Sequence, residues 1–515
     1  MYSTVISGAL QGVSAYLVFV EVDVASGLPC FSMVGSLSGE VKESRERVSV
    51  ALKNAGFDLP PKKVTVNLSP ADRRKEGSAF DLPIAVGILN ALNCFGQSAA
   101  EEILFLGELG LNGELKGVRG VLPIVREAAA RGIRQCIVPA ANAGEGAVIP
   151  GIRVRGAENI GEVFAFLTQG QEEKEELLSG GMGDVWGASA QEREDIPDFE
   201  QVNGQDAARR AAEIAAAGFH NLLMVGPPGA GKSMIARRIP GILPPLTLEE
   251  SLEVTSVVSV AGLMEEGKGL VKTRPFQSPH HTISLAALTG GGVSPRPGMI
   301  SLAHRGVLFL DELPEFQQTV LDSLRQPLEE RRIHISRAGG NVTYPSDFML
   351  VCAMNPCPCG YYPDRNRCRC TDPQVRRYMR RVSGPILDRI DLCVELQPVD
   401  IRELKSRKKP ESSASIRERV LRARRCQEQR FQGTSRRFNA DMEVSDIEKY
   451  CVLGKEEQAF MEKLYCSLQL SARSYHRILK VARTIADLDG EEQIREKHLK
   501  EAVGYRTFDK KYWGR

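Results

Sequence analysis

Most of what this sequence predicts about its fold follows from the stretch Leu222-Leu-Met-Val-Gly-Pro-Pro-Gly-Ala-Gly-Lys-Ser233. An apolar run short enough for one buried strand leads into the pattern G-x-x-x-x-G-K-S, and a run compatible with a helix follows from Met234 to Ile239. A strand, a glycine loop and a helix in this order form a phosphate-binding P-loop. A glycine-rich turn without a ligand is the alternative, which this context disfavours. We therefore expect the chain to bind a nucleoside triphosphate, with ATP as the cofactor.

Each residue of this loop has a candidate role. The backbone of six residues would surround the phosphates, namely Gly226, Pro227, Pro228, Gly229, Ala230 and Gly231. Lys232 would hold the β- and γ-phosphates, and the hydroxyl of Ser233 would ligate Mg²⁺.

A second apolar strand completes the predicted site. It runs from Gly306 to Leu310 and ends in two acids, Asp311 and Glu312. Asp311 would hold Mg²⁺, directly or through its water, and Glu312 would polarise the attacking water. Two acids that only cap a strand end are the alternative. Because both halves of one site occur in the same region, we expect ATP hydrolysis rather than binding alone.

Composition sets the broad class of the protein. A length of 515 residues favours about three domains. The net charge of +2 gives no sign of a polyanion partner for the chain as a whole. The N-terminus lacks the pattern of a signal peptide, and no apolar run is long enough to span a membrane. The 12 cysteines are scattered apart from one tight group, which favours a reducing, cytoplasmic location.

The region before the P-loop has the pattern of an α/β domain, which we place at residues 1–168. Strands are expected at Tyr16–Val24 and Lys63–Leu68, and helices at Val41–Ala55 and Leu82–Leu92. Two strands between Ile103 and Leu115 are expected to turn at Asn112-Gly113. Glu and Gly dominate residues 169–200, which predicts a linker.

Three segments of this first domain resemble the Lon-protease-type domain: Lys75–Pro83, Gly107–Leu109 and Ala130–Ile133. In that family a serine and a lysine form the nucleophile and its base. The resemblance places Ser78 or Ala79 near the serine, but Ile124 near the lysine. A serine without a base is a poor nucleophile. We therefore expect a non-proteolytic domain used for assembly or substrate docking, and disfavour a peptidase.

Further residues around the P-loop resemble those of AAA+ ATPases. The turn before the long helix Ala207–Ala217 contains Gly204 and Gln205, and in AAA+ proteins such a turn contacts the adenine. An ordinary helix start is the alternative. The strand that ends at Met354 is followed by Asn355, which fits sensor 1, the polar residue that orients the lytic water or touches the γ-phosphate.

Two arginines match AAA+ positions that complete an active site. Arg389, in Ser383-Gly-Pro-Ile-Leu-Asp-Arg-Ile-Asp391, resembles the arginine finger that reaches the γ-phosphate of a neighbouring subunit. Arg473, with Arg477 as second choice, resembles the sensor 2 arginine of the lid domain; a surface arginine without a role is the alternative. The resemblance predicts an AAA+ core with a parallel sheet at residues 201–396, a helical lid at 397–515, and a homo-oligomeric ring.

Longer strings narrow the family to the magnesium-chelatase-like YifB/ComM group. They are Phe276-Gln-Ser-Pro-His-His-Thr-Ile-Ser284, Arg296-Pro-Gly-Met-Ile-Ser-Leu-Ala-His-Arg-Gly306 and Asn355-Pro-Cys-Pro-Cys-Gly360. This resemblance covers nearly the whole chain. It implies an ATP-driven, hexameric DNA helicase that promotes branch migration in natural transformation. We interpret His280, His281 and His304 within these strings as structural histidines rather than metal ligands.

DNA binding has some support from the residues themselves. The segment Arg331–Tyr344 has the pattern of a hairpin, and in related helicases the hairpin before sensor 1 grips nucleic acid. Arg337, near its tip, is the expected phosphate contact, whereas a hairpin that only packs an interface is the alternative. The glycine-rich segment Gly290–Pro297 is a weaker second candidate. Seven arginines lie between Tyr361 and Arg381, which suits either DNA or an exposed, solvated surface.

Four cysteines form a candidate zinc site: Cys357, Cys359, Cys368 and Cys370. Two close pairs on a turn-rich loop can bring four thiolates together in the closed tetrahedral geometry of structural zinc. The C-x-C spacing is tighter than usual, so a redox pair or reduced free thiols are the alternatives.

Two classes of function therefore compete. The first is a ring ATPase that moves along branched or single-stranded DNA. The second is a remodeller of a protein partner, like the magnesium chelatase motor or MoxR-type chaperones, which would need a dedicated partner and show no stimulation by DNA.

Overall fold

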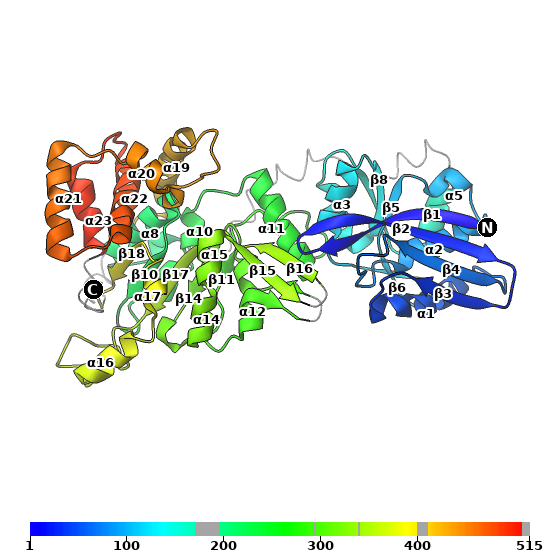
Figure 1. Ribbon diagram of the computed structural model, residues 1–515, viewed down its shortest axis with the longest axis horizontal. Coiled ribbons are helices and arrows are strands. Elements are labelled where there is room, and N and C mark those ends of the chain that lie inside the picture. The colour runs from blue at the N-terminus through cyan, green and yellow to red at the C-terminus, as the bar shows by residue number, and fades with distance from the viewer. Residues whose placement is uncertain (170–195, 293–294, 338–339, 399–409, 507–515) are drawn as a thin grey trace.

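The chain folds into three parts that lie in a row: an N-terminal α/β domain, a central α/β domain and a group of C-terminal helices (Figure 1). The computed structural model of the protein describes residues 1–169, 196–292, 295–337, 340–398 and 410–506. Within these ranges, no helix combines the length and apolarity that crossing a bilayer requires.

The N-terminal domain is built on a seven-stranded sheet of order β3-β4-β2-β1-β5-β8-β9. The strands are β1 (Tyr2–Gln11), β2 (Ser14–Ala25), β3 (Cys30–Val34), β4 (Lys63–Ser69), β5 (Ile103–Phe105), β8 (Gln135–Pro139) and β9 (Arg153–Ala157). The helices are α1 (Gly39–Asn54), α2 (Asp81–Ala91), α3 (Val121–Ala130), α4 (Ala143–Ala147) and α5 (Ile160–Thr168). The predicted strands at Tyr16–Val24 and Lys63–Leu68 and both predicted helices are confirmed. Every residue of α2 is buried, which explains its mostly apolar sequence.

The predicted pair of strands between Ile103 and Leu115 was wrong in part. A short hairpin does turn at Asn112-Gly113, but its arms are only β6 (Glu108–Leu109) and β7 (Leu115–Lys116). The first apolar residues, in β5, pair with β1 and β8 of the main sheet instead. All three residues of β5 are buried, so burial in the main sheet decides their pairing over the turn signal.

The Lon-type resemblance of this domain stays a prediction. Ser78 donates a hydrogen bond from its hydroxyl to the carboxylate of Glu108. Ile124, at the position expected for the base, packs so tightly that a Cβ on Gly8 would lie 2.2 Å from its Cγ2. The nearby Lys75 ammonium donates to backbone carbonyls, including that of Arg73 at 2.9 Å. Ile124 thus occupies the position expected for the lysine and Lys75 is bonded to the backbone, while the carboxylate of Glu108 is the acceptor that Ser78 contacts. The non-proteolytic role stays a prediction.

The central domain is built on a five-stranded sheet of order β11-β14-β17-β10-β18, in which every neighbouring pair is parallel. The strands are β10 (Leu222–Val225), β11 (Phe276–Gln277), β14 (Val307–Leu310), β17 (Met349–Met354) and β18 (Leu392–Glu395). Side chains of β10 alternate between two hydrophobic clusters, with Leu222 and Met224 in one and Leu223 and Val225 in the other. Burial on both faces accounts for the uninterrupted apolar run before the P-loop.

Helices cover both faces of this sheet (Figure 1). The helices of this domain are α8 (Asp206–Gly218), α9 (Lys232–Ala236), α10 (Ile239–Ile242), α11 (Leu248–Ala261), α12 (Leu285–Thr289), α13 (Met299–Leu302), α14 (Gln318–Ser323), α15 (Arg325–Glu330) and α17 (Gly384–Leu387), together with α16 (Asp372–Met379), which projects away from the sheet (Figure 1). The helix expected from Met234 to Ile239 is broken: α9 ends at Ala236 and α10 begins at Ile239. Pro240 lacks an N–H group and does not continue a helix from the preceding turn.

A β-hairpin leaves the central domain on the side of the N-terminal domain (Figure 1). Its strands are β15 (Arg332–Arg337) and β16 (Gly340–Pro345), in the predicted position. The turn between β1 and β2 packs against it at Gly12, whose φ is +67°. A Cβ on Gly12 would lie 2.8 Å from Cγ1 of Val342 and 3.2 Å from the carbonyl oxygen of Thr343. The hairpin is therefore held between two domains.

The C-terminal helices pack on the central domain through α8. They are α19 (Ser413–Arg430), α20 (Val444–Tyr450), α21 (Lys455–Leu468), α22 (Ala472–Asp489) and α23 (Glu496–Gly504). Gln427 of α19 donates to the carbonyl of Ala217 at 3.0 Å, and the rings of Phe219 and Phe438 stack at 4.4 Å. Their role as a lid stays a prediction.

Most of the predicted linker, residues 170–195, lies outside the described residues. Its last part packs on the core. Phe199 is fully buried, and the Asp198 carboxylate accepts a hydrogen bond from the N–H of Ser413 at 2.9 Å. This segment thus joins the start of α19 to the central domain.

Candidate active site

The candidate nucleotide-binding residues meet at one edge of the central sheet. The P-loop follows β10, Asp311 and Glu312 follow β14, and Asn355 follows β17. These three strands are parallel neighbours, so their carboxyl ends deliver all of these side chains to the same edge. Asp311–Glu312 and Asn355, which are far from the P-loop in the sequence, thus lie next to it in the fold.

Backbone geometry explains the glycines of the loop. Gly229 and Gly231 have φ angles of +76° and +90°, in the left-handed region that favours glycine. Gly226 is needed for a different reason, because a Cβ there would lie 2.8 Å from the carbonyl oxygen of Leu396. The loop therefore depends on glycine both for its turn and for its contact with the chain after β18.

Lys232 lies at the centre of the loop. Its ammonium donates to the carbonyl oxygens of Gly226 at 2.7 Å and Pro227 at 2.9 Å, and to Oδ1 of Asn355 at 3.0 Å. Burial lowers the pKa of Lys232, while Asp311 and Glu312 oppose that shift. The structure therefore brings the predicted phosphate-binding lysine and the predicted sensor 1 residue into direct contact.

The two residues expected to hold Mg²⁺ are also in contact. The hydroxyl of Ser233 donates to Oδ2 of Asp311 at 2.6 Å, and Oδ1 of Asp311 accepts from the N–H of Glu312 at 2.9 Å. A hydroxyl and a carboxylate side by side are two of the oxygen ligands that this hard cation prefers. The donor set therefore fits Mg²⁺.

Glu312 has a partner that the sequence reasoning missed. Its carboxylate lies 3.3 Å from Nδ1 of His281, and the side chain is 58% exposed. The His281 ring stacks on His280 at 4.1 Å and meets Phe316 edge-on at 6.4 Å. The two residues of β11, Phe276 and Gln277, give no clear strand signal in the sequence, and the contact follows from the β11–β14 pairing. His281 is thus positioned to orient the predicted water-activating carboxylate. His304, by contrast, is buried and contacts Glu253 at 3.2 Å.

Gln205 lies beneath the loop. Its amide nitrogen donates to the carbonyls of Ala230 at 3.2 Å and Gln397 at 2.7 Å, and only 6% of the residue is exposed. Gly204 before it has a φ of +67°. The turn therefore ties the start of α8 to the P-loop, and its contact with adenine stays a prediction.

Arg389 lies far from the P-loop of its own chain. It precedes β18, and its carbonyl accepts from the amide of Asn221, which precedes β10, at 2.7 Å. Because β10 and β18 are parallel, with Leu222 opposite Leu392, Arg389 lies at the amino edge of the sheet. The four-residue strand alone separates the two edges by about 13 Å. The candidate finger does not share a site with Lys232 in the same chain.

Arg389 instead shares a pocket with Arg473. The pocket has a volume of about 640 Å³ and is also lined by Arg477 and Lys480. Arg473 lies 4.0 Å from Asp388, and Arg389 forms an ion pair with Glu329. Burial lowers the pKa of Arg477 to about 10. We call this set, Arg389, Arg473, Arg477 and Lys480, the arginine pocket.

The four cysteines converge. Sulfur–sulfur distances are 3.4 Å for Cys357–Cys359, 3.7 Å for Cys357–Cys368 and 3.5 Å for Cys359–Cys368, and Cys370 lies within 4.8 Å of all three. Tetrahedral zinc with bonds of about 2.3 Å places its sulfurs about 3.8 Å apart, so this donor set fits zinc. The loop also touches the nucleotide site, because a Cβ on Gly360 would lie 2.4 Å from Cδ of Pro228.

We expect purified protein to contain about one zinc per chain, and the Cys357→Ser variant to lose most of it together with thermal stability. Metal analysis and thermal melting measure both. Cys466→Ser, at an exposed cysteine outside the group, is the control and should change neither. Wild-type protein free of zinc after purification without chelator would contradict this prediction.

We expect His281→Ala to slow ATP hydrolysis about tenfold, because the water-activating Glu312 loses its partner. ATP affinity should be unchanged, since His281 contacts neither the P-loop nor Asp311. His280→Ala is the control and should leave the rate within about twofold. Steady-state turnover and nucleotide titration measure both quantities, and equal rates for both variants would show that the contact with Glu312 has no role.

The comparisons with known proteins agree with this arrangement. Residues 198–404 match the family "Magnesium chelatase, subunit ChlI", residues 20–142 match "Subunit ChlI of Mg-chelatase", and residues 410–506 match "Magnesium chelatase, subunit ChlI C-terminal".

Relatives that align over nearly their full length have higher sequence identity to this chain. The chain is 45% identical to protein YifB of Salmonella typhimurium over 504 residues, which cover 98% of this chain and 96% of that protein. It is also 45% identical to the competence protein ComM of Haemophilus influenzae over 507 residues, or 98% and 97% of the two chains. The magnesium-chelatase 67 kDa subunit of Chlorobaculum parvum is 26% identical over 206 residues, or 39% and 27%. Together with the P-loop site of the parallel sheet, this similarity confirms the predicted family: the chain belongs to the magnesium-chelatase-like YifB/ComM family of AAA+ proteins, and this membership implies ATPase activity.

Proposed function

We propose that this chain is the subunit of a ring-shaped, hexameric ATPase that hydrolyses ATP between neighbouring copies and uses the energy to move DNA. One observation supports the proposal that two copies share each active site. The P-loop and Arg389 lie at opposite edges of the same parallel sheet, so an arginine finger at this position serves another copy.

Six residues of one copy would form the first half of the site. Lys232 exchanges its bonds with loop carbonyls for bonds with phosphate oxygens, and Asn355 next to it contacts the γ-phosphate or the lytic water. Ser233 and Asp311 hold Mg²⁺, which neutralises phosphate charge when bound. Glu312, oriented by His281, accepts a proton from the attacking water.

The neighbouring copy would supply the second half from its arginine pocket. Arg389 and Arg473 lie together there, so both could approach one γ-phosphate of the adjacent copy. Guanidinium groups stabilise the charge that develops in phosphoryl transfer. Head-to-tail contacts of this kind close into a ring when the rotation permits, and the number of six subunits follows from the family resemblance.

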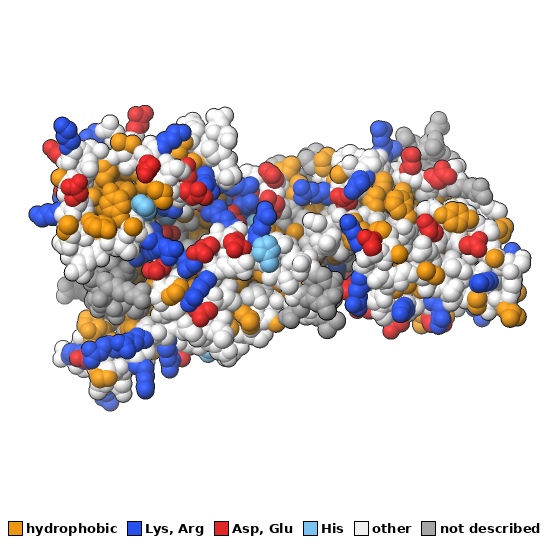
Figure 2. Space-filling view, in the orientation of Figure 1, with side chains coloured by type: hydrophobic (Ala, Val, Ile, Leu, Met, Phe, Trp, Pro, Cys, Tyr) orange, Lys and Arg blue, Asp and Glu red, His pale blue; other side chains and the backbone are white. Residues whose placement is uncertain are grey.

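DNA is the proposed polymer that the ring moves. The β15–β16 hairpin carries Arg337, the proposed phosphate contact in the channel. A second basic surface is the projecting lobe around α16, where Figure 2 shows Lys and Arg side chains gathered. Exposed arginines of this lobe include Arg376, Arg377 and Arg380. Lys and Arg contacts of this kind give sequence-independent affinity for phosphates.

The relatives suggest the biological setting. One of them is named competence protein ComM, which agrees with branch migration in natural transformation or recombination. All 12 cysteines lie in the described residues and none forms a disulfide, in keeping with the proposed cytoplasmic location. The second candidate is a remodeller of a protein partner, which the more distant similarity to a magnesium-chelatase subunit supports.

We expect Arg389→Ala to lower ATP turnover by about 10³-fold with little change in ATP binding. Lys232→Ala should also be inactive, because it removes the phosphate-binding lysine. Mixing the two variants should restore about a quarter of wild-type turnover, since an intact P-loop then meets an intact Arg389 at some interfaces. Turnover that stays absent in every mixture of assembled rings would contradict a finger supplied by a neighbour. Arg381→Ala, an exposed arginine paired with Glu315, is the control.

We expect forked DNA to stimulate ATP hydrolysis several-fold and ATP to drive its unwinding. Arg337→Ala should weaken DNA binding at every sequence and reduce the salt dependence by about one phosphate contact per subunit. Arg332→Ala, at the base of the same hairpin, is the control. Absence of DNA binding, stimulation and unwinding at low salt would exclude the DNA motor and favour the protein remodeller.

A further inference from the structure

The residue that closes the base of the hairpin is Arg331, between α15 and β15. Its N–H donates to the carbonyl of Pro327 and its carbonyl accepts from the N–H of Ser346, both at 2.9 Å. Its φ is +56°, a conformation that residues with side chains seldom adopt. The backbone of Arg331 thus fixes the end of α15 to both strands of the hairpin.

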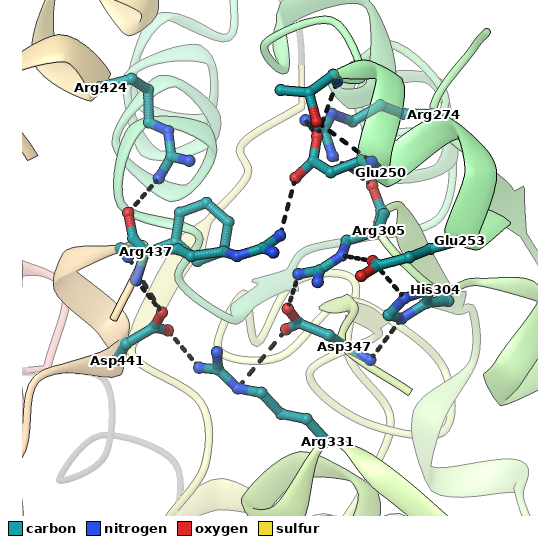
Figure 3. Close-up of polar contacts among 12 residues, drawn as sticks. Glu250, Glu253, Arg274, His304, Arg305, Arg331, Asp347, Arg424, Arg437 and Asp441 are labelled. Carbon is teal, nitrogen blue, oxygen red and sulfur yellow. Dashed lines mark hydrogen bonds and ion pairs between the residues drawn. The ribbon is translucent and has the colours of Figure 1, made fainter. Parts of the chain in front are cut away.

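The side chain of Arg331 joins two domains. Its guanidinium forms an ion pair with Asp441 of the C-terminal part, and its Nε lies 3.6 Å from Asp347, just before β17. Figure 3 shows the guanidinium between these two carboxylates. The Asp441 side chain is 3% exposed. Burial raises its pKa, but Arg331 and the backbone N–H groups of Arg437 and Phe438 together outweigh that effect, so the pKa is lowered. The Arg331 side chain is 38% exposed, so the pair is buried only on the side of Asp441. Loss of Arg331 would leave that buried carboxylate without its counter-charge, which is costly.

The second carboxylate beside Arg331, that of Asp347, is held by further ion pairs within the central domain. Asp347 also pairs with Arg305, and Arg305 reaches Glu253 of α11 at 2.8 Å (Figure 3). Glu253 in turn contacts His304 at 3.2 Å. The carboxylate of Asp347 is therefore fixed by its partners within the central domain. Asp441, in contrast, belongs to the C-terminal helical part, which packs on the central domain.

Two contacts connect the base of the hairpin, around Arg331, with the arginine pocket. The carbonyl of Ala440, next to Asp441, accepts from Lys480 of α22 at 3.0 Å, and α22 also carries Arg473. Glu329, two residues before Arg331, is the ion-pair partner of Arg389. Glu329 is therefore paired directly with Arg389 of the pocket, whereas Arg331 reaches Lys480 only through Asp441 and the neighbouring Ala440.

We propose that the segment Glu329–Arg331 couples the arginine pocket to the β15–β16 hairpin, because Glu329 competes with a neighbour's phosphate for Arg389. The guanidinium that pairs with Glu329 cannot direct the same N–H groups at a γ-phosphate. When Arg389 turns to the phosphate, the end of α15 loses the Glu329–Arg389 ion pair and keeps the Arg331–Asp441 ion pair. The base of the hairpin is then less firmly held. ATP bound at one copy thereby changes the hairpin of the next.

This inference rests on the proposed function, in which Arg389 serves the neighbour's ATP. It does not require that the hairpin holds DNA. The coupling can therefore be measured without DNA, by hydrogen exchange of the amides in β15 and β16 of the assembled protein, with and without a non-hydrolysable ATP analogue.

In the wild type, the analogue should speed exchange in β15 and β16 about threefold, because the hairpin base opens more often. In Glu329→Gln, exchange should be fast already and should not respond further. Asp441→Asn should likewise abolish the response. Glu329 is 54% exposed, so its variant remains a valid test if the buried Asp441 variant does not fold. The control is Asp322→Asn, whose 39% exposed carboxylate pairs with Arg325 at 2.7 Å outside the segment Glu329–Arg331, and it should respond like the wild type.

A wild-type hairpin that does not respond to bound analogue would overturn the coupling, and so would a wild-type response in Glu329→Gln. Either result would leave the shared active site standing if mixed Arg389 and Lys232 variants regain turnover. Conversely, a hairpin that responds in a protein without affinity for DNA would support the coupling and exclude the DNA motor.

Discussion

The parallel pairing of β10 with β18 is the constraint on which the proposed mechanism depends. It fixes the P-loop at the carboxyl edge of the central sheet and Arg389 at the amino edge. Since side chains do not cross this distance, Arg389 and the P-loop of one chain do not share a site. In the proposed mechanism the two belong to different sites, so assembly is a condition of catalysis and ATP at one copy is sensed by the next.

Around this sheet, the P-loop and the hairpin are each held by contacts with other segments. Within the central domain the cysteine loop packs on Pro228 of the P-loop, and from the N-terminal domain the β1–β2 turn packs on the β15–β16 hairpin at Val342. Arg331 ties that hairpin to the C-terminal helices. The glycines leave no room for a Cβ, and the Asp441 carboxylate of the ion pair is buried, so these contacts tolerate little displacement. They therefore restrict the hairpin and the loop.

Local sequence patterns predicted a large part of this arrangement. The P-loop, the acids after β14 and the polar residue after β17 each follow a short apolar run, and parallel strands bring such ends together. His281 escaped prediction because its partner Glu312 lies 31 positions away and is approached only through the β11–β14 pairing. The strand at Ile103–Phe105 was assigned to the wrong partner, since its burial in the seven-stranded sheet outweighs a good turn signal. The roles of Arg337, Arg473 and the cysteine group stay predictions.

The sequence by itself determined the family, the phosphate loop and the residue types that hydrolysis requires, because these depend on backbone conformation and short spacings. Only the tertiary structure decided which residues share a site. It separated Arg389 from Lys232, placed Arg389 beside Arg473, and set Glu329 and Arg331 between that pocket and the hairpin. The reason is that ion pairs and packing join positions far apart in the chain, and their partners follow from strand order and domain contact, which no local pattern records.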